Sequence, residues 1–298
     1  MPGLEYCVVD AFTHSPFQGN PAAVVHGGDD LTDAAKQRIA AEFNLSETVF
    51  ILRPTAHLTQ PTVRLRWFTP QCEVSFCGHA TLAAVHVFCE SSGGTSMQLN
   101  VECAAGNLVV KIEPVSARGQ RYWLAMPPAE LREADVPRDR LDAALRLPAG
   151  EHQVCPLVRT RDNDLILLLS AGRTVTELVP DMAALERLSR EHGIRGVSVA
   201  SPDSGGPQIA CISRFFAPAA GIGEDPVTGS VHGPLATLLI RNGVVPPTEP
   251  DRWSFCCRQL PANGRVGTID VRAESRGEEL AVEVGGACVT VMKGQLSI

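Results

Sequence analysis

Apolar and polar positions follow two periodicities along the chain. Short runs of apolar and β-branched residues bounded by Gly, Pro or Asn predict strands, whereas apolar residues at three- and four-residue spacing predict helices. The first half is expected to hold helices at 31–42, capped by Thr32 or Asp33, and 78–89, with strands at 6–12, 22–25, 48–52, 63–68, 97–103 and 108–112. The second half repeats this order, with helices at 182–192 and 229–242, strands at 157–160, 165–169, 197–200 and 209–216, and further strands across 253–292.

The chain also repeats itself in its motifs. RWFTP at 66–70 is answered by RFFAP at 214–218, an offset of 148 positions (214 − 66 = 148), and each copy leads through a small-residue turn into an apolar helical run. Residues 41–50 have a counterpart at 190–199. A repeat of this length predicts two similar domains that face each other across a cleft, divided near Pro127-Pro128 into residues 1–128 and 129–285.

The helix in the middle of each half is too hydrophobic for a surface position. Residues 82–88 show little polar face, so a strongly curved sheet has to surround them. We therefore expect an α+β fold of two pseudo-symmetric domains, each a β-barrel-like mixed sheet around a central helix.

Composition narrows the classes of function. The net charge of −7 and the lack of a basic cluster argue against nucleic-acid binding. The apolar runs are too short to cross a membrane. The first residues lack a signal-peptide pattern, and the ten scattered cysteines form no CxxC pair, so we expect a cytoplasmic protein with reduced thiols and no metal site. Nucleotide-binding glycine motifs are missing, and none of the three lysines suits pyridoxal phosphate, which leaves proton transfer without a cofactor.

The starts of the two central helices are the first candidate site. Unpaired backbone N–H groups and the helix dipole attract anions there, and Gly78 and Gly229 let a ligand approach the backbone closely. Two such ends at a domain interface predict a clamp for a carboxylate. The alternative is that both glycines merely form tight turns between strand and helix.

Polar residues present in only one copy are the second candidate. Glu47 has no acidic counterpart in residues 193–197, and its apolar neighbours favour a raised pKa and a proton-transfer role, although a solvated loop charge is the alternative. Asp225 precedes the second central helix and is either a turn carboxylate or a functional acid. Cys77 is an acid–base thiol or a small buried residue. His79, in the first helical turn, is expected to stay neutral and to bond substrate or carry a proton.

Several long motifs in order resemble the phenazine-biosynthesis PhzF-like family, whose relatives include diaminopimelate epimerase and proline racemase. The resemblance covers essentially the whole chain and rests on DAF at 10–12, FQGNPA at 17–22, NLSET at 44–48, RWFTP leading to CGHAT at 77–81, and RFFAP leading to EDPVTGS at 224–230. It implies the epimerase-like fold, with a final strand from 286–298 returning to the first domain, a homodimer, and a cofactor-independent isomerase.

The resemblance also implies roles for individual residues. Glu47 matches the family's essential glutamate, and His79 and Asp225 match its active-site histidine and aspartate. The substrate of the phenazine enzymes is trans-2,3-dihydro-3-hydroxyanthranilate, and the implied substrate-binding residues are Asn20, Ser46, Cys77, Gly78, Ala80, Thr228, Gly229 and Ser230. The chain departs from the phenazine pattern at Cys77, where those enzymes tend to have alanine, and at Ala80, where they usually have proline.

Three hypotheses remain open on the sequence. The first is an isomerase that moves a proton within a small carboxylate substrate through Glu47. The second is an amino-acid or hydroxy-acid epimerase or racemase that uses Cys77 with Asp225 or Glu47 on opposite faces of a stereocentre. The third is a binding protein that keeps the fold without the chemistry.

Overall fold

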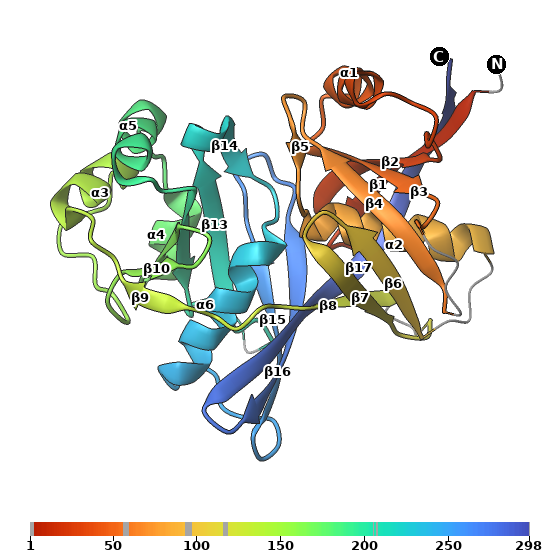
Figure 1. Ribbon diagram of the computed structural model, residues 1–298. Coiled ribbons are helices and arrows are strands. Elements are labelled where there is room, and N and C mark those ends of the chain that lie inside the picture. Colours follow the sequence, from red (N-terminus) through yellow and green to blue (C-terminus); the bar gives the residue numbers. More distant parts are fainter. Residues whose placement is uncertain are drawn as a thin grey trace. The chain divides into compact units, whose positions relative to one another are not determined.

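The computed structural model describes residues 3–55, 60–92, 97–115, 119–204, 206 and 208–297. The chain divides into two compact units (Figure 1). Residues 1–125 and 285–298 form the N-terminal unit, and residues 126–284 form the C-terminal unit. In the described residues, no helix has both the length and the apolar character needed to span a membrane.

A closed ring of strands forms the N-terminal unit. Its eight strands pair in the order β17, β1, β2, β3, β4, β6, β7 and β8, and β8 pairs with β17 again. The bounds are β1 (Leu4–Ala11), β2 (Asn20–His26), β3 (Glu47–Leu52), β4 (Thr62–Phe68), β6 (Gln98–Cys103), β7 (Gly106–Ile112), β8 (Arg121–Ala125) and β17 (Glu279–Leu296), with the two-residue β5 (Glu73–Val74) beside β4.

Helix α2 (Gly78–Ser92) runs against the inside of this ring, where it contacts β1, β2, β3 and β8. Its residues from His79 to Val85, together with Val87, are buried, so the helix has almost no polar face. This confirms the predicted curved sheet around a buried apolar helix. Helix α1 (Asp33–Phe43) packs through Ile39 and Ala40 against a separate apolar cluster, and Thr32 caps it as expected.

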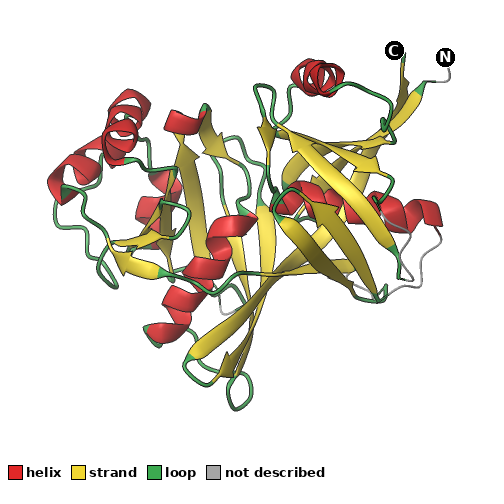
Figure 2. Ribbon diagram, viewed as in Figure 1, coloured by secondary structure: helices red, strands yellow, loops and turns green. Residues whose placement is uncertain are grey.

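The C-terminal unit is a mixed sheet with helices on both faces (Figure 2). Its strands are β9 (Leu131–Glu133), β10 (Val158–Thr160), β11 (Asp164–Leu168), β12 (Gly196–Ser201), β13 (Cys211–Ala217), β14 (Ile222–Asp225), β15 (Arg252–Gln259) and β16 (Gly267–Arg276). Its helices are α3 (Arg138–Leu145), α4 (Gly172–Glu177), α5 (Met182–His192) and α6 (Gly229–Arg241), with a 3₁₀ turn η1 (Pro218–Ala220).

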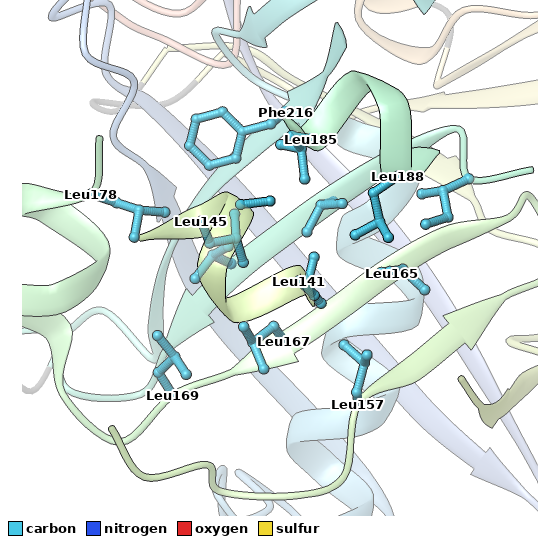
Figure 3. Close-up of a cluster of buried hydrophobic side chains, with 14 of the residues drawn as sticks. Leu141, Leu145, Leu157, Leu165, Leu167, Leu169, Leu178, Leu185, Leu188 and Phe216 are labelled. Atoms are coloured by element: carbon cyan, nitrogen blue, oxygen red, sulfur yellow. The ribbon is translucent and has the colours of Figure 1, made fainter. Parts of the chain in front are cut away.

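Alternation along β11 decides which helices cover which face. Leu165 and Leu167 belong to a buried cluster with residues of α3, α4 and α5, which Figure 3 shows in part. Ile166 and Leu168 belong to a second cluster with residues of α6. Because side chains on a strand point alternately to opposite faces, one strand anchors both layers.

The expectation of one short helix and one central helix in the second half is wrong. Residues 129–148, where no element was predicted, contain β9 and α3, and α4 follows β11. In α3 the buried residues are only Leu141, Ala144 and Leu145, surrounded by charged side chains. A helix this short leaves a weak periodic signal in the sequence.

Candidate functional site

Cys77 fixes the start of α2. Its carbonyl oxygen accepts a hydrogen bond from the Thr81 backbone N–H at 3.0 Å and another from the Thr81 hydroxyl at 2.6 Å. Gly78 is the first helical residue, and a Cβ there would meet only the Phe76 ring, at 3.9 Å. The first turn of α2 therefore leaves room above Gly78, whereas Ala80 in the same turn is fully buried.

Two adjacent strand ends bring polar side chains to this turn. β2 begins at Asn20 and β3 begins at Glu47, and the two strands are parallel neighbours in which Ala22 pairs with Glu47. Ser46 immediately precedes β3. Because parallel neighbours start at the same edge of a sheet, residues far apart in the sequence meet here.

A chain of hydrogen bonds fixes the protonation of His79. The Ser46 hydroxyl donates to Asn20 Oδ1 at 3.5 Å, and Asn20 Nδ2 lies 3.4 Å from His79 Nδ1. Because an amide nitrogen only donates, Nδ1 is the acceptor and the imidazole proton is on Nε2. Nε2 lies 3.2 Å from Glu47 Oε2, a close contact in which the two atoms are not aligned for a hydrogen bond.

Burial keeps this imidazole neutral. The His79 side chain is 7% exposed, and desolvation lowers the pKa of His79 to about 3. The Glu47 side chain is 13% exposed, so it is not a solvated loop charge. A neutral imidazole in contact with the carboxylate does not neutralise it, which suits Glu47 to remove a proton from carbon.

The thiol of Cys77 is the third polar group beside this pair. Its Sγ is 3.4 Å from His79 Nδ1. The Nδ1 atom of the imidazole therefore contacts the thiol, and its Nε2 atom contacts the carboxylate. Glu47, Cys77 and His79 each place one potential metal ligand within 4.8 Å of the others, a donor set that zinc accepts. The carboxylate, the imidazole and the thiol are thus close enough to one another for a proton to pass among them.

The remaining sequence-predicted residues belong to the C-terminal unit. Asp225 ends β14, and its Oδ2 accepts a hydrogen bond from the Thr228 hydroxyl. Gly229 and Ser230 are the first two residues of α6. Gln259, which the sequence reading missed, is fully buried and binds both sides of this turn: its Oε1 accepts from Thr228 N at 2.9 Å, and its Nε2 donates to the Asp225 carbonyl at 2.7 Å.

Arg195 is a second residue that the sequence reading missed. Its guanidinium donates to the Asp164 carboxylate through Nε and Nη2, and Nη2 also donates to Ser230 Oγ at 3.1 Å. The only sequence signal was its position in the repeat, where it replaces Ser46. A charged residue substituted for a small polar one at a shared site was the available hint.

The N-terminal unit is thus a closed mixed barrel around a helix, with a carboxylate, a neutral imidazole and a thiol where the helix begins. Residues 9–294 match the model of a protein family whose description is "Phenazine biosynthesis-like protein". The chain belongs to this family. An uncharacterized isomerase of Pseudomonas aeruginosa is 37% identical over 295 residues, which is 99% of both chains.

Solved structures agree with the fold. The crystal structure of a Bacillus anthracis phenazine biosynthesis protein of the PhzF family has a TM-score of 0.87 at 23% identity and covers 100% of both chains. A probable proline racemase from Agrobacterium radiobacter has a TM-score of 0.66 at 12% identity, with 99% of this chain and 93% of that chain covered. The predicted epimerase-like fold is thus confirmed, and the protein is an enzyme of the isomerase class.

Proposed function

We propose that the protein is a cofactor-independent isomerase that moves a proton within a small carboxylate-bearing molecule, with trans-2,3-dihydro-3-hydroxyanthranilate or a close relative as substrate. Glu47 removes a proton from one carbon and returns it to another carbon of the same skeleton. The double bond shifts as the proton moves, and the elemental formula is unchanged. No redox partner or group carrier is needed for such a step.

One observation carries this proposal: the contact of 3.2 Å between Glu47 Oε2 and Nε2 of the buried neutral His79. The neutral Nε2–H faces the carboxylate while the carboxylate takes up the proton and then returns it. Asn20 and Ser46 fix the tautomer of the imidazole from behind. A base held by its neighbours needs little reorganisation at the moment of transfer.

Asp225, Thr228, Gly229 and Ser230 are proposed to position polar groups of the substrate rather than to take the carbon-bound proton. The Thr228 hydroxyl donates to the Asp225 carboxylate and Gln259 donates to the Asp225 backbone carbonyl, which supports a carboxylate held in a fixed position. The family resemblance supports a homodimer, which light scattering behind a sizing column tests.

Solvent labelling tests the proposal. Trans-2,3-dihydro-3-hydroxyanthranilate is incubated with the enzyme in D₂O, and the product is followed by proton NMR. Wild type is expected to shift the double bond, and Glu47→Gln to lose about 10²–10⁴-fold in turnover because its amide cannot act as a base. Dialysis against EDTA should leave the wild-type rate unchanged.

A matched variant controls for the loss of charge. Glu42→Gln changes an exposed glutamate of α1 and should keep the wild-type rate. If Glu47→Gln turned the substrate over as fast as Glu42→Gln does, Glu47 would not be the base.

The contact between Cys77 Sγ and His79 Nδ1 favours a second candidate function, epimerisation or racemisation of an amino or hydroxy acid. The imidazole can pass a proton between thiol and carboxylate, so the two groups could serve opposite faces of one stereocentre. Amino and hydroxy acids incubated with the enzyme in D₂O would then exchange the α-proton without a change in connectivity. Cys77→Ala should abolish that exchange, whereas it should change isomerisation less than about tenfold, since the thiol is outside the Glu47–His79 pair.

A further inference from the structure

Arg195 sits in an unusually constrained position at the start of the C-terminal unit's β12. The carboxylate of Asp164 accepts from two nitrogens of its guanidinium, with Nε to Oδ1 at 2.9 Å. The Asp164 side chain is 2% exposed, whereas the Arg195 side chain is 42% exposed. One edge of the guanidinium is therefore fixed in the interior and the opposite edge reaches solvent.

The outer edge carries donors that the protein does not fully use. A guanidinium has five N–H donors, and the bonds to Asp164 and Ser230 take three of them. Among the described residues, Nη1 makes no hydrogen bond. Phe215 lies beside the group, with its ring centroid 5.8 Å from the Arg195 Cζ, and helps to set its plane.

Ser230 completes a pair of donors at this edge. Its oxygen accepts from Nη2 of Arg195, so its own O–H is directed away from the arginine. An oxygen ligand in front of Nη1 can then receive bonds from the guanidinium and the hydroxyl together. Two oxygens in one plane match this arrangement, because arginine donors form a planar fork.

The charges around Arg195 favour a carboxylate over a phosphate as its ligand. Burial lowers the pKa of Arg195, but the net shift is upward. The hydrogen-bonded carboxylate of Asp164 and the charges of Asp162 and Asp225 raise this pKa. The guanidinium thus keeps its charge at any physiological pH. Three nearby acids and one cation disfavour a doubly charged phosphate, whereas a singly charged carboxylate needs only the outer edge of the guanidinium.

We propose that Arg195 is an anion-binding residue of the C-terminal unit, which takes the carboxylate of a small organic acid on the outer edge of its guanidinium with Ser230 as a second donor. Asp164 is a positioning residue that holds the guanidinium by its inner edge. The site is independent of the proton-transfer step assigned to Glu47.

Binding of a charged probe and a neutral probe of the same shape tests this directly. Anthranilate and anthranilamide differ in a carboxylate and a carboxamide, and their dissociation constants are measured by isothermal titration calorimetry. Wild type should prefer anthranilate at least about tenfold, the value of a hydrogen bond to a charged group. Arg195→Gln alone leaves Asp164 buried without its cation, so the informative protein is the double variant Arg195→Gln/Asp164→Asn.

The double variant should bind the two probes equally while its affinity for anthranilamide stays unchanged. Arg190→Gln is the matched control: Arg190 is an exposed arginine paired with Glu186 on α5, and its loss should leave the tenfold preference intact. Glu47→Gln should also keep it, so failure of the proposed isomerase and failure of this inference give different results. A double variant that retains the preference, or a wild type without one, overturns the assignment.

Discussion

At the start of α2 a thiol, an imidazole and a carboxylate lie together, whereas the start of α6 carries hydroxyls at the places of the thiol and the imidazole. The two starts share a hydrogen bond from a side chain to the backbone carbonyl four residues earlier. The Thr81 hydroxyl donates to the Cys77 carbonyl, and His232 Nδ1 donates to the Thr228 carbonyl at 2.7 Å. By this match Cys77 corresponds to Thr228, and His79 corresponds to Ser230.

The strands beside these helices differ in the same way. Thr48 pairs with Phe68, and Val197 pairs with Phe216, so Glu47 corresponds to Gly196 and Ser46 to Arg195. In the N-terminal unit a carboxylate contacts the helix residue His79, and in the C-terminal unit a guanidinium contacts Ser230. One fold, used twice, thus carries a carboxylate beside an imidazole in one copy and a guanidinium beside a hydroxyl in the other.

Breaking the matching ion pair in each copy should lower the free energy of unfolding by very different amounts. Arg214 and Glu224 have side chains 4% and 13% exposed, whereas Arg66 and Glu73 are 26% and 37% exposed. Glu224→Gln leaves a buried cation unpaired and should lower the free energy of unfolding by about 3–5 kcal/mol. Glu73→Gln should cost less than about 1 kcal/mol. Urea denaturation measures both, and equal losses would contradict the difference in burial.

Removal of the imidazole should have the next largest effect. His79→Leu takes away the imidazole that contacts Glu47 and should lower kcat by about 10²-fold, or about 2.7 kcal/mol. His152→Leu changes an exposed histidine of the other unit and serves as the control. Turnover in the isomerase assay distinguishes them, and similar rates for both variants would remove His79 from the site.

Substitution of Gly196, the counterpart of Glu47, tests why the second copy has no carboxylate at this position. A Cβ at this position would meet the Phe215 ring at 2.1 Å, so Gly196→Ala overpacks the unit and should destabilise it by about 1–3 kcal/mol. A Cβ at Gly223 meets nothing within 4 Å, and Gly223→Ala should change stability by less than about 0.5 kcal/mol. The melting temperatures of the two variants provide the comparison, and an unaffected Gly196→Ala protein would show that Phe215 moves aside freely.

The last comparison concerns pH. Burial lowers the pKa of His232 from 6.5 to about 4. Between these pH values the unfolded chain binds a proton at this histidine and the folded chain does not, so stability falls as the pH drops from 6.5 to 4. His232→Thr imitates Thr81 and removes this titration, which should flatten the slope by up to about 1.4 kcal/mol per pH unit. His79 still titrates in both proteins. Urea midpoints across that pH range test this, and an unchanged slope would place the acid sensitivity elsewhere.

Much of the fold was readable because the repeat and the apolar helices are strong signals. The helix at 182–192 was predicted with the bounds of α5, and α2 was predicted to within its last turn. Helix α3 was missed because only three of its residues face the core. The cluster of Asn20, Glu47 and His79 could be nominated from motifs, but its hydrogen bonds depend on the pairing of β2 with β3, which no local pattern encodes. Arg195 and Gln259 escaped for the same reason.

The most direct measurement compares one carboxylate from each unit. The rate at which solvent deuterium enters the carbon skeleton of the substrate is measured by NMR for Glu47→Gln and for Asp225→Asn. The account predicts that Glu47→Gln loses about 10²–10⁴-fold in exchange, while Asp225→Asn loses far less because Asp225 only positions the substrate. Fast exchange by Glu47→Gln together with its loss in Asp225→Asn would contradict the assignment of the base to the N-terminal unit.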